Sequence, residues 1–131
     1  MKPIEVLLVE DQAGDILLIK QILAEESFPV HVRVAMDAPQ AMDVLAQRRL
    51  EPDLVILDLN LPKISGLSVL ERCHTDVPVV VFTSSSNPQD RQRSLELGAK
   101  EFVQKPTDLR EYSRAVSEFV EHWTSPSDLA S

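Results

Sequence analysis

Five side chains with reactive or ligating groups stand at or just after the ends of short apolar runs in the sequence: Glu10, Asp11, Asp58, Thr83 and Lys105. Two carboxylates about 4 Å apart repel each other by about 4 kcal/mol at an effective dielectric constant of about 20, so three that converge require a cation. Oxygen-only ligands select a hard ion, and a small cluster with room for water and phosphate oxygens suits Mg²⁺. If the fold brings these residues together, the sequence predicts a Mg²⁺ site beside a hydroxyl and an ammonium group.

Each of these residues also has a purely structural explanation. Asp and Thr after a strand are common helix caps, and a lysine at the end of a strand is usually a solvated charge. The functional interpretation therefore depends on a fold that carries all five side chains to one place.

Short β-branched or leucine-rich runs recur along the chain and predict five strands. They cover Ile4 to Val9, Val30 to Ala35, Asp53 to Leu57, Pro78 to Thr83 and Lys100 to Gln104. Their starts lie 22 to 26 residues apart. This spacing fits one strand, one helix and two short loops, because a parallel crossover needs a connection of helix length. The pattern is a (βα)5 alternation.

The segments between these runs have apolar residues at helical spacing. These residues are Ile16, Ile19, Ile22 and Leu23 in the first segment, Ala41, Met42 and Leu45 in the second, Leu67 and Leu70 in the third, and Leu109, Tyr112, Val116, Phe119 and Trp123 in the fifth. The fourth segment has the clearest boundaries, with Asn87 as the N-cap before Pro88 and Gly98 as the stop.

Three of the predicted strands are apolar throughout, at Val6 to Val9, Leu54 to Leu57 and Val79 to Phe82. Such strands are typical of a parallel sheet covered by helices on both faces. With right-handed crossovers, the prediction is an α/β, doubly wound, flavodoxin-like parallel sheet with strand order 2-1-3-4-5. The carboxyl ends of parallel strands meet at one edge, and strands one and three flank the crevice there. The five candidate side chains should therefore meet at this edge.

The composition describes one acidic domain. The 131 residues carry 13 Lys plus Arg and 21 Asp plus Glu, a formal net charge of −8, which disfavours direct contact with nucleic acid or an anionic membrane. We expect one domain over residues 1–123 and a short flexible tail over 124–131. The chain has neither a membrane-length apolar run nor a signal-peptide core, so we expect a cytoplasmic protein. The single cysteine, Cys73, is expected to be buried in a helix, and the three histidines, His31, His74 and His122, to lie on the surface.

Five ordered motifs resemble the receiver domain of two-component response regulators. They are Val9 to Asp11, Leu57 to Pro62 with Gly66, Val81 to Ser84, Gly98-Ala99 and Lys105-Pro106. The resemblance extends over nearly the whole chain. It implies a phosphoacceptor of a two-component phosphorelay that hydrolyses its own aspartyl phosphate and is not a turnover enzyme.

The resemblance also implies a metal site and a nucleophile. Asp58 would accept a phosphoryl group from the phosphohistidine of a histidine kinase. The backbone carbonyl of Asn60 would join the carboxylates of Glu10, Asp11 and Asp58 in binding Mg²⁺. The side chain of Asn60 would help to control how long the phosphoryl group stays.

The remaining implied roles concern the phosphoryl group and the switch. Thr83 would hydrogen-bond the phosphoryl group, and Lys105 would pair with it. Phe102 would be the aromatic switch position that responds with Thr83, without the hydroxyl of the commoner Tyr. The Lys105–Pro106 bond is expected to be cis.

Two other functions share this pattern. A receiver-like scaffold would bind partners without phosphorylation. A dehalogenase-type phosphatase also uses an Asp nucleophile with Mg²⁺, Thr and Lys, but it resembles a pattern with a second Asp two residues after the nucleophile. This chain has Asn60 there, and a carboxamide cannot donate a catalytic proton.

Shorter stretches resemble stand-alone receivers that serve phytochrome-type histidine kinases. These are Asp58 to Pro62, Lys105 to Leu109 and Phe119 to Trp123. Because the chain ends about eight residues after the last predicted helix, we expect no attached output domain and a signal that passes by contact to a downstream protein. We also expect a homodimer in which Tyr112 or Trp123 contacts the partner subunit.

Overall fold

Five parallel strands form one sheet with the order β2-β1-β3-β4-β5. The computed structural model describes residues 2–72 and 76–124. In chain order the elements are β1 (Ile4–Val9), α1 (Ala13–Ala24), β2 (Val30–Ala35), α2 (Ala38–Leu45), the short 3₁₀ turn η1 (Arg48–Leu50), β3 (Leu54–Leu57), α3 (Leu67–Arg72), β4 (Val79–Thr83), α4 (Pro88–Glu96), β5 (Glu101–Gln104) and α5 (Leu109–Trp123). The predicted fold class and strand order are confirmed.

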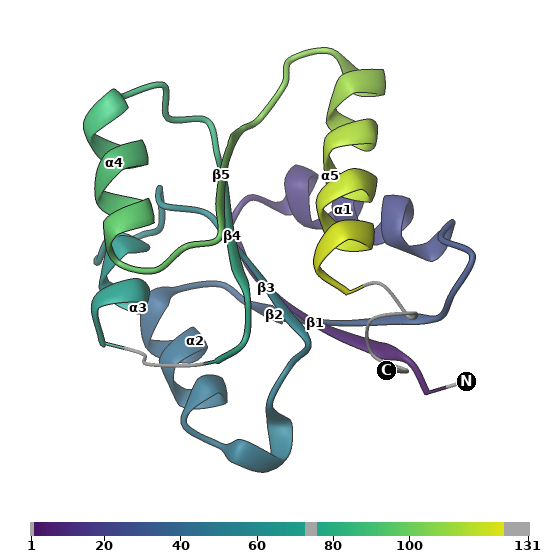
Figure 1. The fold of residues 1–131 in the computed structure, drawn as a ribbon, viewed down its shortest axis with the longest axis horizontal. Helices are drawn as coiled ribbons and strands as arrows, with labels where there is room; N and C mark the ends of the chain where they lie inside the picture. Colours follow the sequence, from purple (N-terminus) through teal and green to yellow (C-terminus); the bar gives the residue numbers. More distant parts are fainter. Residues whose placement is uncertain (1, 73–75, 125–131) are drawn as a thin grey trace.

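Helices cover both faces of the sheet, with α1 and α5 on one side and α2, α3 and α4 on the other (Figure 1). Successive side chains of a strand point to opposite faces of the sheet, so alternate residues contribute to two separate core layers, one beneath each group of helices. Leu8 and Ile56 pack under α1 and α5, whereas Leu7 and Leu57 pack under the other three helices. Every residue of β3 and β4 is buried, as expected for central strands.

The predicted start and stop of the fourth helix are confirmed. The Asn87 side chain accepts a hydrogen bond from the backbone N–H of Gln89 at 2.9 Å, and Pro88 occupies the first helical position. Gly98 ends the segment with a φ of +109°, in the left-handed region that glycine adopts without strain. Within α4 only Ser94 is buried, so few side chains fasten this helix to the sheet.

The fifth helix confirms most of its predicted apolar stripe. Tyr112, Val116 and Phe119 are buried against the sheet. Leu109 was predicted to belong to this stripe, and that prediction is wrong: its side chain is 61% exposed. It is the first helical residue after the cap Asp108, so it precedes the part of α5 that packs on the strands.

The sequence also made smaller predictions about the C-terminal tail, the cysteine and the histidines. Thr124, placed in the tail by the sequence, is buried directly after α5. His31 and His122 are exposed, as predicted. The predictions for Cys73 and His74 fall outside the described residues. Within the part of the chain that the structure describes, no helix has the length and apolar character to cross a membrane.

Candidate functional site

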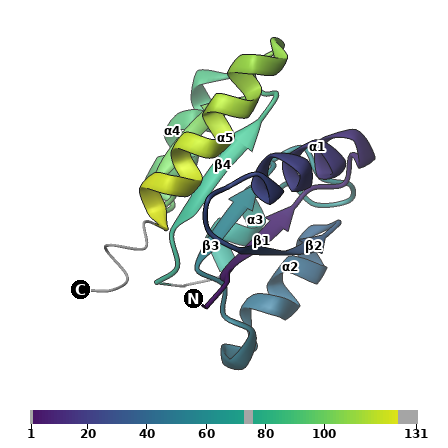
Figure 2. The same cartoon turned by 90° about the vertical axis from the view of Figure 1, so that its right-hand side faces the viewer.

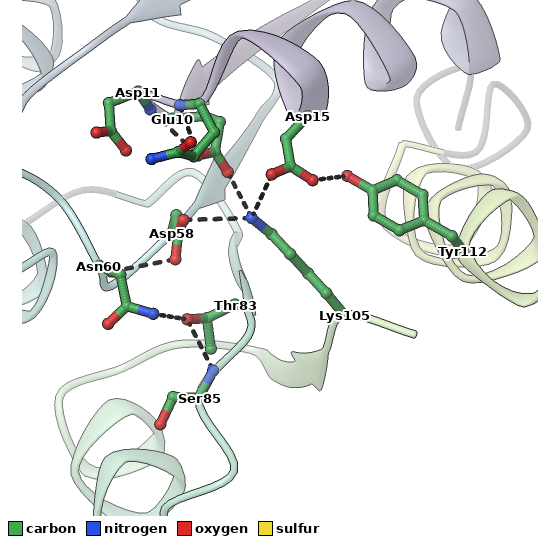
Figure 3. Close-up of polar contacts among 10 residues, drawn as sticks. Glu10, Asp11, Asp15, Asp58, Asn60, Thr83, Ser85, Lys105 and Tyr112 are labelled. Atoms are coloured by element: carbon green, nitrogen blue, oxygen red, sulfur yellow. Dashed lines mark hydrogen bonds and ion pairs between the residues drawn. The ribbon is translucent and has the colours of Figure 1, made fainter. Parts of the chain in front are cut away.

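Strand register explains why distant residues meet at the carboxyl edge of the sheet. Val9 pairs with Leu57, and Leu57 pairs with Val81, so the last residues of β1 and β3 lie in line with each other and two residues before the end of β4 at Thr83. The acidic pair Glu10-Asp11 follows β1, Asp58 follows β3, and Lys105 follows β5. The structure therefore brings together the five side chains that the sequence singled out (Figure 3).

The three predicted metal-binding carboxylates form one cluster. Oxygen atoms of Glu10, Asp11 and Asp58 lie within 4.8 Å of one another. Glu10 is 1% exposed and Asp58 is 4% exposed. The Oδ1 atom of Asp11 is buried and has no hydrogen-bond partner among the described residues. Converging carboxylates and an unpartnered buried oxygen fit a hard cation, because that ion would satisfy both.

Lys105 supplies the positive charge nearest to this cluster. Its Nζ atom lies 2.8 Å from Oε2 of Glu10, 3.3 Å from Oδ2 of Asp58 and 3.2 Å from Oδ2 of Asp15. The lysine side chain is only 7% exposed, so solvent screens these contacts weakly. Three carboxylates thus contact one ammonium group, and with Asp11 of the same cluster they leave the site with an excess of negative charge.

Burial and neighbouring charges change the proton affinities at the site. The pKa of Glu10 is raised to about 7. Burial is the main cause, the hydrogen bond from Lys105 partly opposes it, and the charge of Asp58 adds to it. Burial alone would lower the pKa of Lys105, but the hydrogen bond with Glu10 and the charge of Asp58 raise it above its usual value. Lys105 therefore stays an ammonium group at neutral pH.

Thr83 and Asn60 connect β4 to the loop after β3. The hydroxyl oxygen of Thr83 accepts hydrogen bonds from Nδ2 of Asn60 at 3.4 Å and from the backbone N–H of Ser85 at 3.3 Å. The backbone N–H of Asn60 donates to Oδ1 of Asp58 at 3.1 Å. Asn60 thereby joins the acidic cluster to the predicted hydroxyl. The role of its backbone carbonyl as a metal ligand remains a prediction.

Phe102, the predicted aromatic switch, lies on β5 opposite Val81 of β4. It is partly buried and packs against the core on the side of α2, α3 and α4. Its role as a switch remains a prediction.

The backbone at Lys105 corrects one expectation. The Lys105–Pro106 bond is trans, so the cis bond implied by the resemblance is wrong. The trans form is the ordinary state of an X–Pro bond, with cis at only about 5% in folded proteins. The backbone N–H of Lys105 donates to the carbonyl of Thr83 at 2.7 Å, which holds the start of this loop against β4.

Two residues of the site were not identified from the sequence as members of it. Asp15 lies in the first turn of α1, and its Oδ1 accepts a hydrogen bond from the Tyr112 hydroxyl at 2.5 Å. A signal for Asp15 was present, since the helix that follows Glu10-Asp11 must begin at the same edge of the sheet. Tyr112 is 6% exposed, so its predicted availability to a partner subunit is wrong.

Gly66 supports the loop that carries Asp58. A Cβ atom at this position would lie 2.2 Å from the backbone carbonyl oxygen of Asp58 and 2.9 Å from Cα of Leu59. The backbone N–H of Gly66 donates to the carbonyl of Leu59 at 3.0 Å. Only glycine permits this close approach, so the motif's glycine sets the path of the loop beneath the acidic cluster.

Comparisons with solved structures point to one group of proteins. The chain is similar to the phosphorylated cyanobacterial phytochrome response regulator RcpA, with 34% identity over 95% of this chain and 96% of that one and a TM-score of 0.87. It is also similar to the Mn²⁺-bound form of the response regulator Rcp1, with 31% identity over 95% of this chain and 96% of that one and a TM-score of 0.84.

Sequence relatives lead to the same group. The sporulation initiation phosphotransferase F of Bacillus subtilis (strain 168) is 30% identical over 88% of this chain and 93% of its own length. Some relatives are longer: the chain spans 24% of the probable cyclic di-GMP phosphodiesterase of Vibrio cholerae, which is 35% identical in the matched region. Residues 6–117 match the family model described as the response regulator receiver domain. Since this match covers most of the chain and the acidic cluster, hydroxyl and lysine lie where the motifs predicted them, the chain belongs to the response regulator receiver domains of two-component systems.

Proposed function

We propose that Asp58 accepts a phosphoryl group from the phosphohistidine of a partner histidine kinase. The observation that carries this proposal is the position of the Asp58 carboxylate, which belongs to the acidic cluster and also contacts the ammonium group of Lys105. Receiver domains of two-component systems interact with histidine kinases, so a donor of this kind follows from the family.

The proposed transfer is a displacement at phosphorus. A carboxylate oxygen of Asp58 attacks the phosphorus atom, the P–N bond of the phosphohistidine breaks, and its electron pair returns to the imidazole nitrogen. The product is an acyl phosphate on Asp58. The ammonium group of Lys105 offsets the charge of the phosphoryl oxygens, and the hydroxyl of Thr83 donates a hydrogen bond to one of them.

The contacts of the other carboxylates make them poorer acceptors. Glu10 Oε1 already accepts from the backbone N–H groups of Asp11 and Gln12, and Oε2 accepts from Lys105. Asp11 has no contact with Lys105 among those that the structure describes. Asp58 belongs to the cluster and contacts Lys105, as Glu10 does, but among the described hydrogen bonds its side chain accepts from one backbone N–H group, that of Asn60, and not from two, which supports it as the nucleophile.

We assign the acidic cluster to Mg²⁺. Glu10, Asp11 and Asp58 would hold the ion with the backbone carbonyl of Asn60. When bound, the ion would neutralise phosphoryl oxygens and reduce the repulsion between the donor and the acidic site. The Mn²⁺-bound form of Rcp1 supports a divalent cation in this family, and the preference of oxygen ligands for hard ions supports Mg²⁺ here.

The protein would act as a phosphorylated switch and not as a turnover enzyme. Hydrolysis of its own aspartyl phosphate resets the signal, and the Asn60 carboxamide orders the attacking water. The output passes from the changed surface around Phe102 to a downstream protein. The similarity to RcpA supports a kinase of the phytochrome type.

We also propose a homodimer through the end of α5. Trp123 is partly exposed there, and its Nε1 donates to Glu101 at 2.8 Å, which fixes the ring at the surface. Light scattering at high concentration, with and without a phosphoryl mimic, should give a dimer mass. A monomer mass under both conditions would refute this assembly.

Labelling identifies the acceptor. The protein is incubated with Mg²⁺ and a small acyl phosphate or a phosphorylated kinase, and its intact mass is measured. The wild type should gain one phosphoryl group, and Asp58→Asn should gain none. Asp76→Asn, at an exposed carboxylate away from the cluster, should behave as the wild type does. Absence of label on the wild type would indicate a scaffold, and label on Asp58→Asn would show that the acceptor is another residue.

A further inference from the structure

Tyr112 and Asp15 form a chain of contacts that ends on Lys105. The Tyr112 hydroxyl donates to Oδ1 of Asp15, and Oδ2 of the same carboxylate contacts Nζ of Lys105 (Figure 3). We propose that Asp15, held by the Tyr112 hydroxyl, positions the ammonium group of Lys105 for phosphoryl transfer to Asp58. This inference rests on the proposed function and adds two positioning residues to it.

Among the described residues, three carboxylates form ion pairs with Lys105, and Asp15 is the one that lies outside the acidic cluster. An ammonium group has three N–H donors, and three carboxylates contact this one at 2.8, 3.2 and 3.3 Å. Glu10 and Asp58 both belong to the cluster assigned to the cation. Asp15 does not, so its contact holds Lys105 whichever ligands Glu10 and Asp58 also bind.

The Tyr112 hydroxyl determines where the Asp15 carboxylate points. The Asp15 side chain is 25% exposed, so without a second partner it is free to turn toward water. The hydroxyl prevents this because it occupies Oδ1 while Oδ2 contacts the lysine. Burial and the Asp15 carboxylate raise the pKa of Tyr112, which keeps the hydroxyl protonated and able to donate.

The tyrosine ring is itself held by the core. It meets the ring of Phe82 edge-on, with centroids 5.0 Å apart, and Phe82 meets Phe119 in the same way at 5.4 Å. Phe82 directly precedes Thr83 at the end of β4. Helices α1 and α5 lie side by side over this part of the sheet (Figure 2). The Tyr112 hydroxyl therefore reaches from α5 to Asp15 of α1, and this hydrogen bond, not the ring packing, is the link to Lys105.

A purely structural role would give a different result. If the contact of Tyr112 with Asp15 only fastened α5 to α1, its loss would lower the unfolding free energy and leave the rate of phosphoryl transfer unchanged. A positioning role instead slows the transfer step while the concentration of donor at half-maximal rate stays the same.

Four variants separate these roles. Tyr112→Phe removes only the hydroxyl and keeps the ring. Phe119→Leu loosens the same aromatic cluster without contacting Asp15. Asp15→Asn removes the charge, and the fourth variant combines Asp15→Asn with Tyr112→Phe. Each is phosphorylated with a small acyl phosphate and Mg²⁺, and unfolding by urea confirms that each is folded.

The rates should show that Tyr112 acts through Asp15. We expect Tyr112→Phe to slow phosphorylation at saturating donor by about ten-fold, less than the roughly 100-fold that a 1 Å misplacement can cost. Phe119→Leu should lower the unfolding midpoint with a wild-type rate. The double variant should be no slower than Asp15→Asn, because the hydrogen bond that the structure describes for the Tyr112 hydroxyl goes to Asp15. A wild-type rate for Tyr112→Phe, equal slowing in Phe119→Leu, or additive slowing in the double variant would overturn the proposal.

A second measurement tests the positioning role of Tyr112 and Asp15 without relying on phosphorylation of Asp58. The NMR signal of the Lys105 side-chain ammonium nitrogen is recorded without any phosphodonor. Tyr112→Phe should shift this signal and speed the exchange of its protons with water, and Phe119→Leu should not. An unchanged signal in Tyr112→Phe would overturn the positioning role. If the wild type accepts no phosphoryl group at all, the proposed function fails, and the Lys105 signal still decides whether Tyr112 positions the lysine.

Discussion

Replacing Asp11 with alanine should stabilise the metal-free protein, although it removes a charged residue from the functional site. Oxygen atoms of Asp11 lie within 4.8 Å of oxygens of Glu10 and Asp58, and Lys105 contacts only the other two carboxylates of the cluster. At 4.8 Å and an effective dielectric constant of about 20, one such pair repels by about 3.5 kcal/mol. Asp11 also buries an oxygen without a hydrogen-bond partner, which typically costs about 1–3 kcal/mol.

Not all of this energy should be recovered in the variant. Asp11 is partly exposed, so solvent and salt screen its repulsion, and losing a negative charge near the start of α1 costs about 0.3–1 kcal/mol. We therefore expect the unfolding free energy of Asp11→Ala to rise by about 1–3 kcal/mol, which corresponds to about 3–10 °C in Tm for a domain of this size. The structure shows no side-chain cap on α1 that the substitution would remove.

Urea unfolding at pH 8 in EDTA and in Mg²⁺ tests this reasoning. In EDTA, Asp11→Ala should unfold at a higher urea concentration than the wild type. Mg²⁺ at about 100 times its Kd should stabilise the wild type by about 2.7 kcal/mol and the variant far less. Asp76→Ala, at an exposed carboxylate, should match the wild type in both solutions. A variant that is destabilised by more than about 1 kcal/mol in EDTA, or one that Mg²⁺ stabilises as much as the wild type, would refute the electrostatic account.

Three further changes test other parts of the site. Gly66→Ala should lower the unfolding free energy by about 1–3 kcal/mol and slow labelling of Asp58, because its Cβ would lie 2.2 Å from the Asp58 carbonyl oxygen; a wild-type urea midpoint and labelling rate would contradict this. Asn60→Met should still accept a phosphoryl group but lengthen its lifetime after donor removal at fixed pH and Mg²⁺, since a thioether orders water poorly; an unchanged or shorter lifetime would leave Asn60 a turn residue only. Phosphorylation should change amide hydrogen exchange first in α4 and around Phe102, because only Ser94 of α4 is buried; equal changes across the whole domain would argue against a localised response.

Local patterns in the sequence were enough to predict the architecture and most of the site. Strands such as Val79–Thr83 are apolar throughout because helices cover both faces of the sheet. Parallel strands present their carboxyl ends at one edge, so the order of the elements alone predicted that Asp58 and Lys105, 47 residues apart, would be neighbours. Cap and stop signals at Asn87 and Gly98 act within a few residues, and the structure confirms both.

The contacts between elements could not be read in this way. Helical spacing identifies the face of α5 that packs, but the depth at which the helix docks decides that Tyr112 reaches Asp15, 97 residues away, while Leu109 stays exposed. Likewise, the motif includes Gly66, but the sequence does not show that this glycine lies against the backbone carbonyl of Asp58. The spacing of residues along the chain determines which edge or face a side chain occupies. The distance between two side chains on different elements depends on how those elements pack, and only the tertiary structure decides that.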